Sequence, residues 1–290
     1  MMQIKVTAVA AALLLIASLG GTAFTQEKPK AEEEQADPSQ YVFPVEAGTS
    51  VSVGPKSAKV TMITFLDYQC PFCARLADSQ KQLRKDYDDK LRIVIKQFPL
   101  PFHQGADLIS EAALAAAEQG KFWPMHLKLL ENYKTLAISR RTKKEDLPAE
   151  LEKLKSTLVD YAGEMGMDKD KFKTALDSKS VKDQIEADQN DAKAVKIMAT
   201  PSTFINGRLL MGAQPVEKFK EIIDEELGWA AKGKRPALKT AKLVSDVVKP
   251  PQRQSQGPDP NKRYTIELAK TPIMGSKDAK VTVVAFLDYQ

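Results

Sequence analysis

The stretch "DYQCPFCARL", residues 67–76, contains both cysteines of this 290-residue chain, Cys70 and Cys73. Before it, the β-branched and apolar run at residues 59–66 is typical of a strand. After it, residues 74–87 carry apolar side chains at helical spacing. A strand, a C-x-x-C segment and a helix in this order place Cys70 at a helix N-terminus, where free backbone N–H groups and the helix dipole stabilise a thiolate.

The spacing of the cysteines favours a bond that is repeatedly made and broken. A disulfide that closes so short a loop adds little stability, because stabilisation grows with loop length. Thiols in such motifs have pKa values of about 3.5 to 7.5 instead of about 8.5. We predict that Cys70 is the nucleophile and that Cys73, one helical turn later, resolves a mixed disulfide formed at Cys70. Pro71 suits the first helical turn, since it has no N–H to lose there.

Other uses of a cysteine pair fit less well. A zinc site needs four ligands, whereas the two histidines of the chain, His103 and His126, have no close ligand partner in the sequence. A C-x-x-x-C copper carrier has a different spacing, and an inert structural disulfide remains an alternative. We expect no metal and no other cofactor, because the redox-active cysteine pair itself carries the electrons.

A second landmark is "MATPSTFINGRLLMGAQP" at residues 198–215. It predicts a strand at residues 202–205, a tight turn at Asn206-Gly207 and a second strand at residues 208–211.

Together, the C-P-F-C motif and the Thr200-Pro201 pair before this strand make the chain similar to the DsbA-like branch of the thioredoxin superfamily, from about residue 41 to residue 233. The resemblance implies an α/β, thioredoxin-like fold with a helical insertion at about residues 104–195. It also implies that Pro201 is a cis-proline beside the sulfurs, and that Thr200 and Pro201 bind the extended peptide of a substrate.

The same resemblance implies an exported thiol–disulfide oxidoreductase that acts on exported cysteine-containing proteins. Oxidation of these proteins is the favoured direction, with a quinone-linked membrane protein as redox partner. Disulfide isomerisation or reduction is the first alternative. A peptide-binding chaperone module without turnover is the second. A nucleic-acid partner is not expected, because the net charge of +5 is spread along the chain without a dense basic block.

Two positions depart from the family pattern. Thr64 stands where thioredoxin has a buried acid, six residues before the first cysteine, and Asp67 is the nearest carboxylate in the sequence. Asp67 either assists proton transfer from Cys73 or caps the turn. Phe72 stands where strongly oxidising DsbA proteins have histidine, so it offers the Cys70 thiolate neither charge nor a hydrogen bond, and we predict a less oxidising disulfide. For His103, we expect a local hydrogen bond in preference to an approach to the disulfide.

The chain divides into five segments by composition. They are a signal peptide (1–23), a disordered tether (24–45), the DsbA-like thioredoxin domain (46–233), a linker (234–262) and the start of a second such domain (263–290). The signal rests on Lys5, an apolar run too short for a typical span, and small residues that follow it. An uncleaved signal anchor is the alternative, and the expected location is the periplasm or another exported site.

The last segment repeats the approach to the cysteines. Residues 54–69 and 275–290 agree at eleven of sixteen positions without a gap. This agreement predicts an internal duplication. We expect the sequence to be a truncated record of a tandem protein, while a natural C-terminal strand that pairs with or swaps into the first domain is the rival hypothesis.

Overall fold

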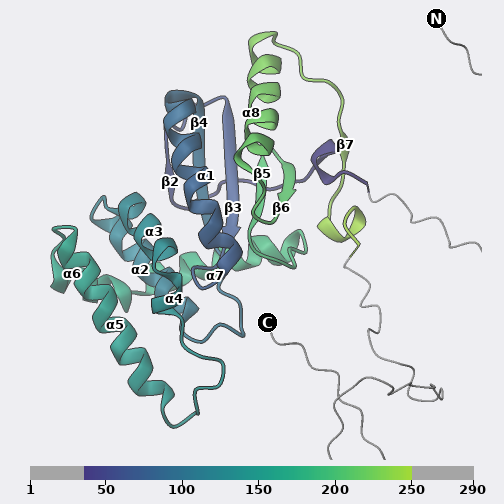
Figure 1. Ribbon diagram of the computed structural model, residues 1–290. Coiled ribbons are helices and arrows are strands. Elements are labelled where there is room, and N and C mark those ends of the chain that lie inside the picture. Colours follow the sequence, from purple (N-terminus) through teal and green to yellow (C-terminus); the bar gives the residue numbers. More distant parts are fainter. Residues whose placement is uncertain (1–35, 250–290) are drawn as a thin grey trace, which may run out of the picture. The chain divides into compact units, whose positions relative to one another are not determined.

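A seven-stranded sheet is the centre of the computed structural model, which describes residues 36–249. The strand order is β2-β4-β3-β5-β6-β1-β7 (Figure 1). The strands are β1 (Tyr41–Val42), β2 (Ser52–Val53), β3 (Val60–Leu66), β4 (Leu91–Gln97), β5 (Ser202–Ile205), β6 (Arg208–Met211) and β7 (Lys239–Thr240). The α-helices are α1 (Pro71–Tyr87), α2 (Ala106–Glu118), α3 (Phe122–Glu131), α4 (Tyr133–Leu136), α5 (Leu147–Glu164), α6 (Lys169–Leu176), α7 (Lys179–Ala194) and α8 (Val216–Ala231). Short 3-10 helices occupy Pro38–Gln40, Asp88–Lys90 and Val244–Asp246.

The two central strands, β3 and β4, are parallel and buried almost throughout. Strands covered on both faces read as continuous apolar runs, as these two do. Successive side chains of β3 alternate between two cores: Met62 and Leu66 belong to one, and Ile63 and Phe65 belong to the other. The predicted strand before the cysteines is therefore confirmed, and both of its faces are packed.

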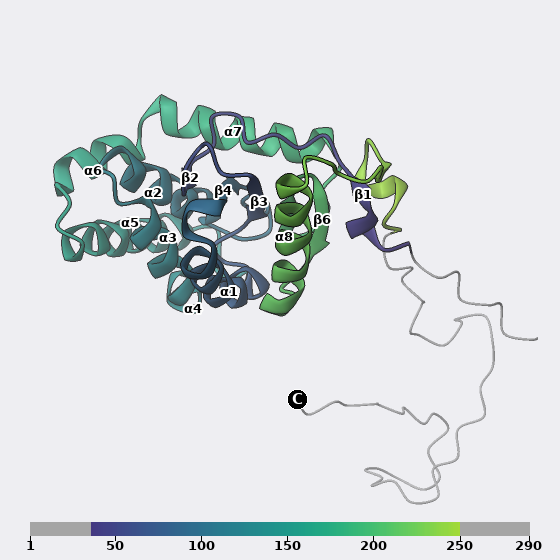
Figure 2. The ribbon, with the colours of Figure 1, turned by 90° about the horizontal axis from the view of Figure 1, so that it is seen from above.

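Helices cover the sheet on both sides (Figure 2). On one side lie α1 and α8, which pack against each other and contribute Leu76 and Phe219 to the larger core. On the other side lies α7, which contacts β4. Lys96 of β4 is buried and its Nζ forms an ion pair with Asp191 of α7 at 2.6 Å. The α7 helix is thus fixed to the sheet by charge as well as by packing.

The segment between β4 and α7 is helical, as the resemblance implied. The α2 helix is its centre, because α2 contacts α3, α5, α6 and α7. Its sequence "ADLISEAALAAAE" is mostly alanine and leucine, and small side chains allow several helices to approach closely. Figure 1 shows α2 to α6 gathered beside the sheet. Among the helices of residues 36–249, none combines the length and the apolar character that crossing a bilayer requires.

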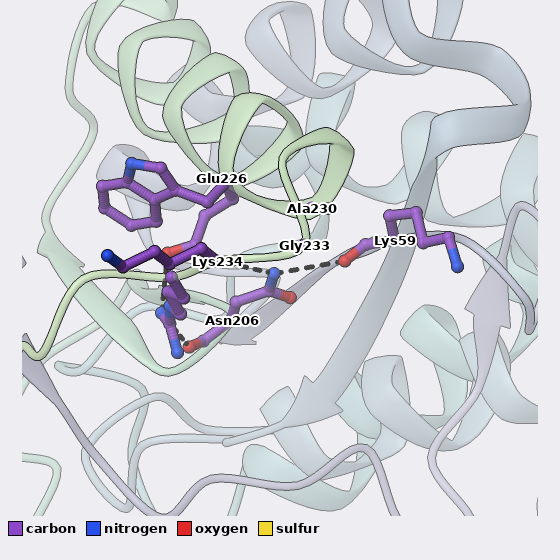
Figure 3. Close-up of a pocket in the computed structure, with 8 residues that line it drawn as sticks. Lys59, Asn206, Glu226, Ala230, Gly233 and Lys234 are labelled. Atoms are coloured by element: carbon purple, nitrogen blue, oxygen red, sulfur yellow. Dashed lines mark hydrogen bonds and ion pairs between the residues drawn. The ribbon is translucent and has the colours of Figure 1, made fainter.

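The hairpin β5–β6 has the predicted bounds and the predicted turn. Asn206 and Gly207 both have positive φ, at 46° and 85°, which is the conformation of the tight hairpin turns that favour Asn-Gly. The Asn206 side chain accepts a hydrogen bond from the Thr61 backbone and donates one to Glu226 of α8. Figure 3 shows this contact in a pocket of about 330 Å³ next to the C-terminal end of α8.

Two predicted boundaries are wrong. Residues 41–45 were assigned to the disordered tether, yet β1 pairs with β6 and Phe43 is buried against the Phe204 ring. Residues after 233 were assigned to the linker, yet β7 pairs with β1 and Val244 is buried. Both segments are ordered because they cover the second face of the sheet. The predicted signal peptide, the second domain and most of the tether lie outside the described residues.

Candidate active site

Cys70 is the N-cap residue of α1, and Cys73 lies in its first turn. The helix begins where the Ala74 N–H donates to the Cys70 carbonyl oxygen. Cys70 is 5% exposed and Cys73 is fully buried, and both are free thiols. Cys70 at the helix N-terminus and a shielded Cys73 in the first turn are therefore placed as predicted, and their roles as nucleophile and resolving thiol stay predictions.

The two thiols differ in acidity. The pKa of Cys70 is lowered to about 5, chiefly by the hydrogen bond from the Cys73 thiol, with further donors at Thr200 and at the backbone of Cys73 and Phe72; burial opposes this effect. The pKa of Cys73 is raised well above its ordinary value, chiefly by burial. At neutral pH the pair therefore holds a thiolate at Cys70 beside a protonated Cys73.

The loop before β5 lies against the Cys70 sulfur. The Thr200–Pro201 peptide bond is cis, as the resemblance implied. Cys70 Sγ is 3.4 Å from the Thr200 carbonyl oxygen, to which the thiol donates when Cys70 is protonated. The antiparallel pairing of β5 with β3, with Ser202 opposite Phe65, brings this loop to the end of the strand that leads to Cys70. The loop is thereby placed directly beside the Cys70 sulfur.

The Thr200 hydroxyl is buried and has no hydrogen-bond partner among the described residues other than the sulfurs beside it. A buried donor without a fixed partner costs free energy. This cost falls when the hydroxyl donates to a thiolate, which is the form that Cys70 takes at neutral pH. Thr200 thus favours the charged state of the nucleophile.

Asp67 caps the turn that leads to Cys70. Its carboxylate is fully buried; Oδ1 accepts from the Gln69 N–H at 2.6 Å and Oδ2 accepts from the Leu100 N–H at 2.7 Å. His103 Nδ1 lies 2.8 Å from the same Oδ2. The expected local hydrogen bond of the His103 side chain is therefore wrong, because its partner lies 36 residues away. A role of Asp67 in proton transfer stays a prediction.

Phe72 is half exposed between the cysteines, and the Arg75 guanidinium lies 4.5 Å from its ring centre. Pro71 occupies the first helical position, as predicted.

Thr64, at the position of the thioredoxin acid, is fully buried and shares a hydrogen bond with the Thr203 hydroxyl at 3.1 Å. At the position of the thioredoxin acid, this chain therefore has a neutral pair of threonine hydroxyls in place of a carboxylate.

Sequence reasoning did not find two further residues near the site. Arg140 donates to His103 Nε2 at 3.3 Å, and Tyr68 is hydrogen-bonded to the buried His126 at 3.0 Å. The first pair joins the loop before α2 to the loop between α4 and α5, and the second joins the turn after β3 to α3. Both span long sequence separations, so no local pattern signals them. Within residues 36–249, no group of three or more His, Cys, Asp or Glu side chains is arranged to hold a metal ion.

Residues 46–225 match the family model described as "Thioredoxin". The chain belongs to the thioredoxin family. This match includes both cysteines and the loop at Pro201, so the family assignment rests on the segment that forms the site.

The thioredoxin-family segment also has curated relatives. One is a Na(+)/H(+) antiporter NhaA of Herminiimonas arsenicoxydans, 30% identical over 207 residues, which covers 71% of this chain and 30% of the relative. The chain thus spans less than a third of the length of this antiporter. Another is a "probable disulfide bond formation protein D" of Bacillus cereus, 29% identical over 223 residues, which covers 75% of this chain and 92% of the relative.

A solved structure of similar fold is alpha-DsbA1 of Wolbachia pipientis. It has a TM-score of 0.55 and 18% identity to this thioredoxin-family chain, and the match covers 66% of this chain and 96% of that one. The predicted fold, a thioredoxin-like sheet with a helical insertion, is confirmed by this likeness.

Proposed function

We propose that this protein exchanges disulfides with protein substrates through Cys70 and Cys73. The observation that carries the proposal is the position of Cys70, at the N-cap of α1 with the Thr200 carbonyl 3.4 Å from its sulfur. A thiolate is the reactive form in disulfide exchange, and a helix N-terminus favours it. The similarity to a probable disulfide bond formation protein of Bacillus cereus supports the same activity.

In the oxidising direction, a substrate thiolate attacks Cys70 Sγ of the Cys70–Cys73 disulfide and Cys73 leaves as the thiolate, which takes up a proton. The second substrate thiolate then attacks the substrate sulfur of the mixed disulfide, and Cys70 leaves. Two electrons pass from the substrate to the cysteine pair, and the substrate gains a disulfide. The exchange itself needs no cofactor, because both electrons reside on the sulfurs.

We propose oxidation of exported proteins as the direction in the cell, with reoxidation by a quinone-linked membrane protein. A stable Cys70 thiolate favours the reduced enzyme and therefore makes its disulfide a better oxidant. The pKa of about 5 for Cys70 lies between the values of about 7 for thioredoxin and about 3.5 for DsbA. This supports a disulfide less oxidising than that of DsbA. Isomerisation and reduction remain the alternatives.

The test is oxidation of a dithiol peptide by the oxidised full chain, with insulin reduction as the reverse assay. We expect Cys70→Ser to lose activity in both assays, and Cys73→Ser to accumulate a mixed disulfide at Cys70. Activity of Cys70→Ser equal to that of the wild type would contradict the proposal and favour a peptide-binding module without turnover.

The direction has a separate test. Equilibration with glutathione buffers gives the reduction potential, which we expect to lie between those of thioredoxin and DsbA, at about −270 and about −120 mV. A potential equal to that of DsbA would contradict the effect assigned to Phe72.

A further inference from the structure

A line of three polar side chains leads away from the cysteine turn. Asp67 follows β3, His103 lies between β4 and α2, and Arg140 lies between α4 and α5. His103 Nδ1 is 2.8 Å from Asp67 Oδ2, and Arg140 NH2 is 3.3 Å from His103 Nε2. Three segments that are distant in the sequence are thus joined through one imidazole.

The partners of His103 define its hydrogen-bonding state. A carboxylate only accepts and a guanidinium only donates. His103 therefore carries its proton on Nδ1, which faces Asp67, and offers the Nε2 lone pair to Arg140. The Arg140 guanidinium also lies 4.5 Å from the centre of the Phe102 ring, next to the imidazole. His103 is held from both sides, and its side chain is only 12% exposed.

Asp67 connects this line to both cysteines. Its carbonyl oxygen accepts from the Cys70 N–H at 3.1 Å, and its carboxylate accepts from the Gln69 N–H. The backbone N–H of Asp67 also acts on the Cys73 sulfur, since it opposes the rise in the pKa of Cys73. A shift of residue 67 would therefore move the acceptor of the Cys70 N–H and the N–H that acts on Cys73 together.

We propose that His103 is a positioning residue for the thiol pair, which fixes Asp67 and thereby aligns Cys73 for attack on a mixed disulfide at Cys70. The inference rests on the proposed function and deepens it. In the step concerned, the Cys73 thiol gives its proton to water and its thiolate attacks Cys70 Sγ. The Cys70–Cys73 bond forms, the bond between Cys70 and the bound thiol breaks, and that thiol leaves as its thiolate. Alignment matters in this step because the attacking sulfur, the Cys70 sulfur and the leaving sulfur must lie nearly in line.

Four variants of the full chain separate this role from general stability. His103→Phe removes both hydrogen bonds, whereas His103→Asn places an amide N–H near the position of Nδ1 and keeps the donor to Asp67. Arg140→Ala removes only the outer partner. The matched control is Arg141→Ala, which removes an exposed guanidinium of the same loop. Circular dichroism and thermal melting verify that each variant is folded.

The measurement is the rate at which Cys73 releases glutathione from a mixed disulfide at Cys70, followed by rapid acid quench and mass spectrometry. We expect His103→Phe to slow this release about threefold to tenfold, the size of one lost hydrogen bond. His103→Asn should restore the rate to within about twofold of the wild type, and Arg140→Ala should slow it by about twofold, because the donor to Asp67 is what positions the turn. Arg141→Ala should match the wild type.

Two results would overturn the inference: a wild-type rate in folded His103→Phe, or equal impairment of His103→Asn and His103→Phe. If His103→Phe does not fold, Arg140→Ala decides, and an unchanged rate in that variant overturns the inference. A wild-type chain that forms no mixed disulfide with glutathione would instead contradict the proposed function. The two failures are therefore distinguishable.

Discussion

The two ends of β5 perform different tasks. At its first residue, Ser202, the strand meets Pro201 and the Cys70 sulfur, and the buried Thr200 hydroxyl lacks a fixed partner. After its last residue the strand enters the Asn206 turn, where the side chains of Asn206 and Arg235 both donate to Glu226. At the first end the Thr200 hydroxyl is free to donate to a reacting sulfur. At the other end the polar side chains hold the hairpin in place by hydrogen bonds.

The paired end includes a buried carboxylate. Glu226 of α8 is 3% exposed and accepts from Asn206, and it forms ion pairs with Arg235 at 2.6 Å and with Arg208 at 3.6 Å. Figure 3 shows Glu226 and Asn206 facing each other beside α8. A substitution at the Thr200 end of β5 should therefore change the reactivity of Cys70 and leave the free energy of unfolding nearly unchanged. A substitution at the Asn206 end should lower the free energy of unfolding and leave the reactivity of Cys70 unchanged.

The largest effect should be seen in the alkylation of the thiols. Because the pKa of Cys70 is about 5 and that of Cys73 is raised by burial, iodoacetamide at pH 6 should modify Cys70 at least about a hundredfold faster than Cys73. The rate at Cys70 should rise with pH, with a midpoint near pH 5, since the thiolate is the nucleophile. Mass spectrometry of peptides measures both rates. A midpoint above pH 8 would contradict the claim that Cys70 is a thiolate at neutral pH.

Glu226→Ala should give the largest loss of stability. It leaves Arg208 and Arg235 with reduced pairing, and Arg208 is itself buried. We expect the free energy of unfolding in urea to fall by about 2–3 kcal/mol. This is less than the loss of about 3–5 kcal/mol for a fully buried pair, because Arg208 keeps Glu225 as a partner and Arg235 is partly exposed. The alkylation midpoint of Cys70 should stay at its wild-type value. A shifted midpoint would mean that the two ends of β5 are coupled.

Gly207→Ala should destabilise the same end to a smaller degree. The residue has φ of 85°, and an added Cβ would lie 2.8 Å from the Val42 side chain and 2.9 Å from the Phe43 carbonyl oxygen. We expect a loss of about 1–2 kcal/mol in the free energy of unfolding, because a side chain is strained in this conformation. Urea unfolding measures this loss. Gly233→Ala is the control, because Gly233 also has a positive φ, at 62°, but an added Cβ there meets no other atom. It therefore shows the cost of the backbone conformation without the cost of a close contact.

Thr200→Val should show the opposite pattern and the smallest change in stability. Valine has the shape of threonine without the hydroxyl, which is buried and has no fixed partner. We expect the free energy of unfolding to change by less than about 1 kcal/mol. The pKa of Cys70 should rise, so its alkylation midpoint should move above pH 5. An unchanged midpoint would show that Thr200 does not act on the thiolate.

Local patterns in the sequence were sufficient for the elements that carry the cysteines and the proline loop. The strand before Cys70, the helix that begins at Pro71 and the hairpin around Asn206 each depend on neighbouring residues. The family resemblance implied that the proline loop lies beside the sulfurs, and the structure shows that loop at the start of β5, which pairs with β3. These features were therefore predictable.

Long-range contacts account for what was missed. Residues 41–45 are apolar but few, and they directly follow a charged stretch; the pairing of β1 with β6 and the contact of Phe43 with Phe204 order them. The Asp67–His103–Arg140 line depends on three loops that meet after folding. A sequence pattern reports the neighbours of a residue along the chain, and these partners are neighbours only in space.

The short parallel pairing of β1 with β7 has a mechanical consequence. Both strands lie at one edge of the sheet, two residues long, with β7 outermost. Tension applied between residues 36 and 249 would load this two-residue ladder first, and it would pull β1 and β7 in opposite directions along their length because the two strands are parallel. The β3–β5 ladder, which holds the cysteine turn against the proline loop, lies behind it and would carry force only afterwards. Under such tension the β1–β7 pair should therefore separate before force reaches the contact between the cysteine turn and the proline loop.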